Sequence, residues 1–255
     1  MRINPLLAAS LILGCALQTP LNRYGLPVID SVAIYQRSVR LDSSKAMIDL
    51  ARHAPSIRLD IRYASENNFM GKVLYPEARA FLRLPAADAI RAIQQELSAE
   101  GIGLKIFDAY RPYHVTEMMW EPYKDPNYVA DPAKGSRHNR GAAVDVTLVR
   151  LDSGEELAMP TAYDDFTPRA AHAFTDLPAE VLENRARLRA VMEKHGFEAL
   201  ESEWWHYDYT GWRRFELMDL PFSAFGSQPE TGAIGERPPG PIEAASRRPS
   251  QTTQI

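Results

Sequence analysis

Apolar residues recur along the middle of the chain with two different periods, one typical of strands and the other of helices. The strand pattern is found at 57–63, 103–109, 143–149 and 204–209. The helical pattern predicts one helix between Pro85 and Gly101 and another over 178–194, which Gly196 ends. Several links between the strands are too short to contain a crossover helix. We therefore expect an α+β fold rather than a doubly wound parallel sheet.

The beginning of the chain has the pattern of an export signal. Arg2 precedes an apolar run over 5–13, which is too short to span a bilayer but suits a secretory signal. The residues Ile-Leu-Gly-Cys that end at Cys15 resemble a bacterial lipoprotein box, and Gly-Cys-Ala at 14–16 also fits ordinary signal cleavage. We expect residues 1–16 to be a signal segment and the protein to be exported to the periplasm or cell envelope. A lipid anchor at Cys15 is favoured over free secretion.

The other end of the chain has a different composition. Residues 226–255 are rich in Gly and Pro and contain no aromatic residue. Such a segment buries too little apolar surface to offset its ordering entropy, so it predicts a disordered tail. The remainder, 25–225, is long enough for one domain with one core.

Composition excludes several classes of protein. With 45% hydrophobic and 24% charged residues, the chain resembles an ordinary globular protein rather than a polytopic membrane protein or a wholly disordered chain. A single Cys cannot form an internal disulfide or a Cys-rich zinc module. The formal net charge of −4 argues against nucleic acid as the main partner, because phosphate binding needs a basic surface. The six His are enough to build a metal site.

One segment with residues suited to metal binding is Ser-Arg-His-Asn-Arg-Gly-Ala-Ala-Val-Asp at 136–145, which leads into an apolar strand. An acidic side chain such as Asp145 is expensive to bury unpaired, so a cation partner is a natural explanation. His138 and Asp145 would point to opposite faces of a regular strand. The chain must therefore turn between them, and Gly141 is the residue able to adopt the positive φ that the turn needs.

The second segment is Glu-Trp-Trp-His-Tyr at 203–207. In a strand Glu203 and His206 point oppositely unless the strand begins near Glu203, so only one of them is easily a metal ligand. We assign His206 as the metal ligand and Glu203 as the general base that accepts a proton from the attacking water. Taken one at a time, each of these residues is more often a structural hydrogen-bonding group, and Trp204-Trp205 more often packs in a core.

The pattern S-x-H-x-x-G-x-A-x-D followed by E-W-W-H-Y resembles the zinc D-alanyl-D-alanine dipeptidase family, the type known from vancomycin resistance. The resemblance covers about 45–220 and includes further segments, in family order. These are Ile-Arg-Tyr-Ala at 61–64, Asn-Asn-Phe-Met-Gly at 67–71, Asp-Ala-Tyr-Arg-Pro at 108–112, residues 148–165 and Gly-Phe-Glu at 196–198. It implies a single compact domain of the hedgehog/DD-peptidase type, with a mostly antiparallel sheet and flanking helices.

The resemblance also implies a metal centre with one Zn²⁺ per chain. Its ligands would be His138, Asp145 and His206, and its catalytic base would be Glu203. Arg111 would stabilise the oxyanion of the reaction, which fits its chemistry because a fixed cation in a dry site favours developing negative charge.

The same resemblance implies the substrate contacts. Asp164 would hold the free ammonium group of the substrate, and Ser136 and Arg137 would line the pocket. Asp165, beside Asp164, leaves the ammonium assignment open between the two carboxylates. Pro160 stands where the family pattern leads us to expect Gly, so the loop that carries Asp164 can differ in shape.

The expected activity is hydrolysis of D-alanyl-D-alanine to two D-Ala in cell-wall peptide metabolism, with a small D,D-dipeptide as the substrate. One alternative is a D,D-carboxypeptidase of the same superfamily, which acts on peptidoglycan stem peptides. Another is an inactive relative that only binds cell-wall peptide. Substrate length separates the two enzymes, because a carboxylate that binds a free amino terminus restricts the pocket to dipeptides.

Overall fold

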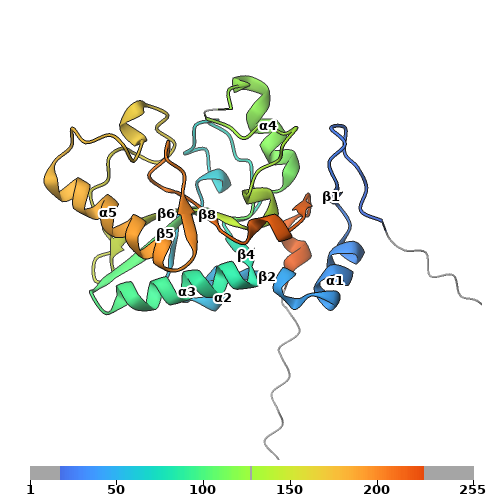
Figure 1. Cartoon of the computed structure of the whole chain (residues 1–255), viewed down its shortest axis with the longest axis horizontal. Helices are drawn as coiled ribbons and strands as arrows, with labels where there is room; N and C mark the ends of the chain where they lie inside the picture. The colour runs from blue at the N-terminus through green and yellow to red at the C-terminus, as the bar shows by residue number, and fades with distance from the viewer. Residues whose placement is uncertain (1–17, 127, 227–255) are drawn as a thin grey trace, which may run out of the picture. The chain divides into compact units, whose positions relative to one another are not determined.

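A central sheet of five strands, in the order β3-β5-β6-β8-β7, carries the middle of the molecule (Figure 1). The computed structural model describes residues 18–126 and 128–226. All neighbouring strands of this sheet are antiparallel except β3 and β5, which are parallel. The strands are β3 (Arg58–Leu59), β5 (Ile102–Asp108), β6 (Ala143–Arg150), β7 (Phe197–Ala199) and β8 (His206–Tyr209). The mixed architecture confirms the predicted α+β class and its mostly antiparallel sheet.

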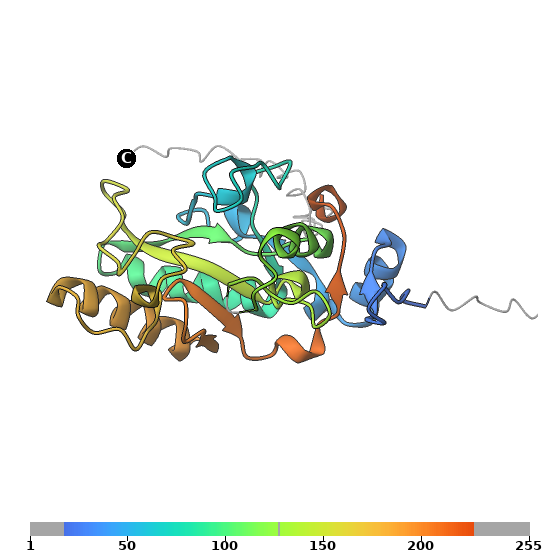
Figure 2. The ribbon, with the colours of Figure 1, turned by 90° about the horizontal axis from the view of Figure 1, so that it is seen from above.

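Helices flank this sheet. The long helices α3 (Leu84–Ser98) and α5 (Ala179–Lys194) pack against β5 and β7 respectively, and both were predicted from their apolar spacing. In Figure 1 they lie on one side of the sheet, and α4 (Tyr113–Tyr123) lies on the other. From above, α5 and α1 (Val32–Leu41) lie at opposite ends of the described fold (Figure 2).

Several short elements could not be read from apolar periodicity. They include α2 (Leu50–His53) and two small sheets, one of β2 (Met47–Asp49) with β4 (Phe81–Arg83) and one of β1 (Val28–Ile29) with β9 (Leu217–Met218). Strands of two or three residues are too short to display a period. The helix α4 is hard to predict because its own apolar and aromatic residues are spread over several of its faces, and because Pro122 lies inside it.

Two of the predicted strands are shorter than expected. The strand predicted over 57–63 is wrong beyond Leu59, because Arg62–Ala64 form a 3-10 turn. There the carbonyl of Tyr63 accepts hydrogen bonds from the backbone N–H groups of Leu74 and Tyr75 instead of a strand partner. The strand predicted over 204–209 begins only at His206, since a turn occupies the residues just before it.

The site rests on a hydrophobic core that joins the sheet to its helices. Its buried side chains include Ile90 of α3, Leu104 of β5, Val146 of β6 and Leu188 of α5. The pair Trp204-Trp205 belongs to the same core, with each side chain 1% exposed. The indoles thus anchor the turn before β8 and fix the residues on either side of it.

Among the described residues, no helix has the length and apolar character needed to cross a membrane. The signal segment expected at 1–16 lies outside the described residues. So does the tail expected at 226–255, apart from Gly226.

Candidate metal centre and active site

The pairing of β6 with β8 brings two of the predicted ligands together. Asp145 and His206 are directly opposite each other in the antiparallel ladder, which is the arrangement that puts side chains in contact across strands. Oδ1 of Asp145 lies 3.0 Å from Nδ1 of His206. The ladder therefore sets this contact without help from any loop.

The third predicted ligand comes from the turn before β6. His138 begins a 3-10 turn that ends at Gly141, whose φ of +65° reverses the chain into the strand. A Cβ at Gly141 would lie 2.6 Å from Cε of Met47, so a side chain here would also require the end of Met47 to shift. This is the turn that the spacing of His138 and Asp145 requires.

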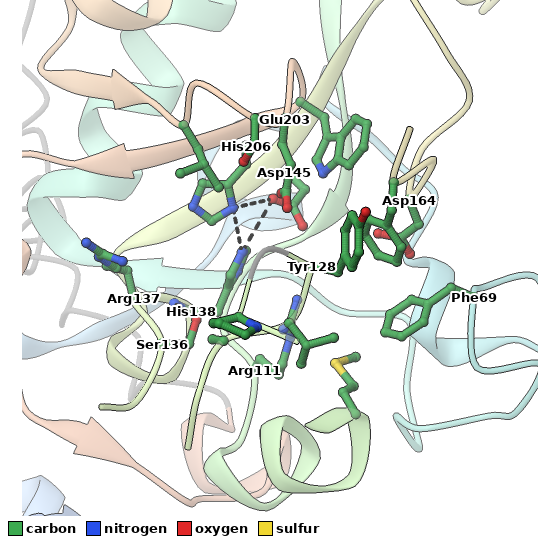
Figure 3. Close-up of a pocket in the computed structure, with 18 of the residues that line it drawn as sticks. Phe69, Arg111, Tyr128, Ser136, Arg137, His138, Asp145, Asp164, Glu203 and His206 are labelled. Carbon is green, nitrogen blue, oxygen red and sulfur yellow. Dashed lines mark hydrogen bonds and ion pairs between the residues drawn. The ribbon is translucent and has the colours of Figure 1, made fainter. Parts of the chain in front are cut away.

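The three donor atoms form a compact triangle (Figure 3). Nε2 of His138 lies 3.2 Å from Nδ1 of His206 and 3.4 Å from Oδ1 of Asp145, and the third side is 3.0 Å. Metal–ligand bonds of about 2.0–2.1 Å at tetrahedral angles place donors roughly 3.3 Å apart. The residues present therefore fit one tetrahedrally coordinated divalent metal ion.

Outer hydrogen bonds set which nitrogen of each imidazole faces the triangle. Nδ1 of His138 lies 2.6 Å from the carbonyl of Ala109, and Nε2 of His206 lies 3.0 Å from Oδ1 of Asp208. A neutral imidazole that donates from its outer nitrogen keeps a lone pair on the inner one, where a metal binds. Neither outer partner was predicted, although Asp208 lies two residues after His206 and so on the same strand face.

Charge in the triangle also favours a cation. Burial opposes ionisation of Asp145, yet the imidazoles of His138 and His206 outweigh it and hold the pKa of this carboxyl well below its usual value. Oδ2 of Asp145, the oxygen outside the triangle, accepts a hydrogen bond of 2.8 Å from the hydroxyl of Tyr163. The carboxylate is thus ionised and fixed with Oδ1 toward the imidazoles.

Glu203 lies beside the triangle without belonging to it. It is half-buried and lines the same pocket, in the turn that immediately precedes β8. Burial raises the pKa of Glu203 to about 7, against the opposing effect of His206. Because the strand begins at His206, Glu203 precedes the pleat, and both side chains face the pocket (Figure 3).

Arg111 contributes a fixed positive charge. It follows β5, and its Nε and Nη2 donate to Oδ2 of Asp108 at 3.0 and 2.8 Å. Burial alone would lower the pKa of Arg111, but Asp108 outweighs it and keeps the guanidinium charged. Asp108 also accepts a hydrogen bond from Tyr75, so it is a positioning group that the sequence analysis missed. Its place at the end of a buried strand, just before Tyr-Arg-Pro, was the available signal.

The structure separates the neighbouring carboxylates Asp164 and Asp165. Asp164 lines the pocket and accepts a hydrogen bond of 3.1 Å from the hydroxyl of Tyr63. Its φ of +60° is unusual for a residue with a side chain, and such strain collects at functional sites. Asp165 instead accepts from the backbone N–H of Thr167 and lines a neighbouring cavity. Burial, together with the charge of Asp145, raises the pKa of Asp164 well above its usual value.

Every site residue predicted from the sequence lines one cavity of about 280 Å³. Asp164 and Arg137 lie on opposite sides of the donor triangle in Figure 3. Aromatic rings gather near Asp164, where Phe166 lies 5.3 Å from Phe69 and 5.1 Å from Tyr128 between ring centroids. On the other side, the hydroxyl of the buried Ser136 accepts from the backbone N–H of His138. The pocket therefore has an aromatic end and a basic end, with the triangle between them.

The chain is similar in sequence to known D-alanyl-D-alanine dipeptidases. Residues 43–227 match the family model described as D-Ala-D-Ala dipeptidase. A D-alanyl-D-alanine dipeptidase of Escherichia coli (strain K12) is 35% identical over 188 residues, which cover 72% of this chain and 95% of the relative. One of Enterococcus faecium is 33% identical and covers 59% of this chain and 85% of the relative. The solved D,D-dipeptidase VanXYg, in complex with a D-Ala-D-Ala phosphinate analogue, is 18% identical, with a TM-score of 0.34 over 65% of this chain and 66% of that chain.

Proposed function

The chain belongs to the D-Ala-D-Ala dipeptidase family, and on that premise we propose that it is a zinc-dependent dipeptidase that hydrolyses D-alanyl-D-alanine to two D-Ala in cell-wall peptide metabolism. The observation that carries the proposal is the donor triangle of His138, Asp145 and His206 with a free carboxylate, Glu203, beside it. The same residues argue against an inactive relative, because a binding module would need no base at this position.

The donor set supports zinc as the metal, one ion per chain. Two imidazoles and one carboxylate are a common ligand set of catalytic zinc, and they leave a fourth position open. The borderline-soft character of the imidazoles suits Zn²⁺ better than Mg²⁺ or Ca²⁺, which prefer oxygen ligands alone. When bound, such an ion polarises the scissile carbonyl and lowers the pKa of water.

Glu203 is the proton carrier in this proposal. As a carboxylate it accepts a proton from the attacking water, and as a carboxylic acid it returns that proton to the leaving amine. The raised pKa of Glu203, about 7, suits a group that must both take and give a proton near neutral pH. Because the three ligand positions belong to other residues, its oxygens stay available for this transfer.

Arg111 is the group that stabilises the negative charge which develops on the carbonyl oxygen. Its two hydrogen bonds to Asp108 fix the guanidinium before substrate arrives, so little reorganisation is needed during the reaction. Its position in the wall of the pocket supports this role.

The two ends of the pocket suit the two ends of a dipeptide. At the aromatic end, Asp164 would pair with the substrate's ammonium group, whose positive charge would favour the ionised form that burial and Asp145 disfavour, with Tyr63 holding the carboxylate in place. At the basic end, Ser136 and Arg137 would lie near the terminal carboxylate. The carboxylate at the aromatic end favours a free amino terminus and therefore a dipeptide over a stem peptide.

Export is a separate part of the proposal. The apolar run at 5–13 and the Ile-Leu-Gly-Cys segment support an exported enzyme of the periplasm or cell envelope, anchored by lipid at Cys15. Fractionation of cells that express the full chain, and of a Cys15→Ala variant, tests this. Wild type in the membrane fraction and the variant released from it would support the anchor, and wild type in the cytosol would contradict export.

The activity itself is tested with purified protein and three substrates: D-Ala-D-Ala, L-Ala-L-Ala and a pentapeptide that ends in D-Ala-D-Ala. We expect turnover of the first only, loss of turnover with a chelator, and recovery with Zn²⁺. Preferred cleavage of the pentapeptide would favour the carboxypeptidase, and zinc binding without any cleavage would favour a binding protein.

A further inference from the structure

The outer nitrogen of His206 has a carboxylate as its partner. Its Nε2 lies 3.0 Å from Oδ1 of Asp208, and both residues are buried in β8. Residues two apart in a strand share a face, so the backbone itself holds the carboxylate behind the imidazole. Donation of the Nε2 proton to Asp208 leaves the Nδ1 lone pair for the donor triangle.

The two imidazoles of the triangle differ in this respect. Nδ1 of His138 hydrogen-bonds the backbone carbonyl of Ala109, with Oδ2 of Asp108 farther away at 3.6 Å, whereas His206 hydrogen-bonds a carboxylate directly. A carboxylate raises the basicity of the imidazole more than a carbonyl does, and it adds negative charge near the cation. The donor strength of His206 is therefore more dependent on its outer partner than that of His138.

Arg137 holds Asp208 in this position. Its Nε lies 3.3 Å from Oδ2 of Asp208, the oxygen that does not face His206. The guanidinium in turn lies over the ring of Trp212, 4.9 Å from the ring centroid. Each carboxylate oxygen of Asp208 thus has its own partner, which restricts rotation of the side chain.

We propose that Asp208, anchored by Arg137, is a positioning residue that orients His206 and strengthens its bond to the metal. The inference rests on the proposed function, because it concerns the metal of the dipeptidase. It goes beyond that function by assigning a role to Asp208 and a second role to Arg137, in addition to its place beside the substrate.

The test compares Asp208→Ala and Asp208→Asn with wild type. Zinc affinity is measured by competition with a chromophoric chelator, and the ligand geometry by the visible spectrum of the Co²⁺-loaded protein. Loss of an outer-shell partner is expected to weaken zinc binding by about 10- to 100-fold in Asp208→Ala. Asp208→Asn keeps an acceptor oxygen but loses the charge, so we expect an intermediate affinity. Both variants should change the Co²⁺ spectrum, which a purely structural role would leave as in wild type.

Two further variants separate this role from general damage. Asp219→Asn alters another aspartate paired with a histidine, His114, outside the pocket, and should bind zinc like wild type. Arg137→Ala should weaken zinc binding less than Asp208→Ala, because Asp208 remains, and Arg137→Lys should recover part of the loss. Urea denaturation of the metal-free proteins reports whether Asp208→Ala still folds.

The outcomes distinguish the inference from the proposed function. If wild type neither binds zinc nor cleaves the dipeptide, the proposed function is wrong. If wild type does both, while folded Asp208→Ala binds zinc as tightly and with the same Co²⁺ spectrum, Asp208 has no positioning role.

Discussion

The two sides of the active site are built on different kinds of structure. Asp145 and His206, on the metal side, are paired across the ladder of β6 and β8. Asp164 and Tyr63, on the side that we propose binds the substrate, come from a loop and from a 3-10 turn. A ladder fixes side chains through many backbone hydrogen bonds, whereas a loop fixes them through a few side-chain contacts. Two of the predicted ligands are therefore on strands, and His138 and Glu203 lie in turns directly before strands, whereas the groups proposed for recognition lie farther from the ladder.

This contrast has a consequence for substitutions. Changes on the metal side should alter turnover or metal binding for every substrate. Changes on the substrate side should alter selectivity and leave the metal in place.

The largest effect is expected for Glu203→Gln, beside the metal ligands. Loss of the proton carrier should lower kcat for D-Ala-D-Ala by about 10²–10⁴-fold. The ligand triangle is untouched, so the variant should keep its zinc, as measured by metal analysis of the purified protein. Glu201→Gln is the matched control, because Glu201 is an exposed neighbour whose partner is Arg189. Near wild-type turnover in Glu203→Gln, or loss of its zinc, would contradict the assignment.

Asp164→Asn tests the substrate side. Hydrogen bonds to charged groups contribute about 1.5–3 kcal/mol, so kcat/KM for D-Ala-D-Ala should fall roughly 10- to 150-fold. Zinc content should not change. The preference for D-Ala-D-Ala over its N-acetylated form should shrink, because the acetylated amine has no charge to pair. Asp165→Asn, whose carboxylate caps Thr167, should retain the preference. Equal losses for both substrates would mean that Asp164 does not read the ammonium group.

Gly141→Ala tests the turn that delivers His138 to the ladder. A side chain at φ of +65° is strained, and its Cβ would also meet Cε of Met47 at 2.6 Å. The left-handed conformation alone costs about 1–2 kcal/mol. Gly154→Ala is the matched control, with a φ of +76° and no atom within 4 Å of the added Cβ. By urea denaturation, Gly141→Ala should lose more unfolding free energy than Gly154→Ala. Equal losses would show that the side chain of Met47 moves aside without lowering the unfolding free energy.

The metal side was also the easier one to predict from sequence. His138, Asp145, Glu203 and His206 lie in two short segments, each next to a strand whose apolar pattern is visible. The need for a turn at Gly141 followed from the spacing of two residues and simple strand geometry. For these residues, the local sequence pattern predicts the same positions that the tertiary structure gives them.

The outer partners could not be predicted in the same way. Tyr163 touches Asp145 from a loop 18 residues further along the chain, and no local period marks it. Asp108 lies only three residues before Arg111, but its role is clear only once Arg111 is known to need a fixed partner. Tyr63 was predicted to lie in a strand, because apolar and polar residues alternate around it. The tertiary contacts that form the 3-10 turn are not visible in the sequence. Asp208 had a signal, its spacing from His206, but that spacing matters only once His206 is known to need an acceptor.

The smallest effect is expected where the two sides meet, at the hydroxyl of Tyr163. It donates to Oδ2 of Asp145 on the metal side and lies 3.2 Å from the hydroxyl of Tyr63, which donates to Asp164. Tyr163→Phe removes one oxygen from a buried ring, and the stacking of that ring on Phe107 keeps it in place.

Because Oδ2 is not the oxygen of the donor triangle, we expect Tyr163→Phe to weaken zinc binding only about 3- to 10-fold, less than the roughly 10- to 150-fold that a directly used hydrogen bond to a charged group is worth. KM for the dipeptide should stay close to wild type. Tyr63→Phe should give the reverse pattern, a raised KM with unchanged zinc affinity. The pair is measured by chelator competition and steady-state kinetics. If each variant instead changes both quantities, the hydroxyls couple the two sides, and the strand-borne and loop-borne parts act as one unit rather than two.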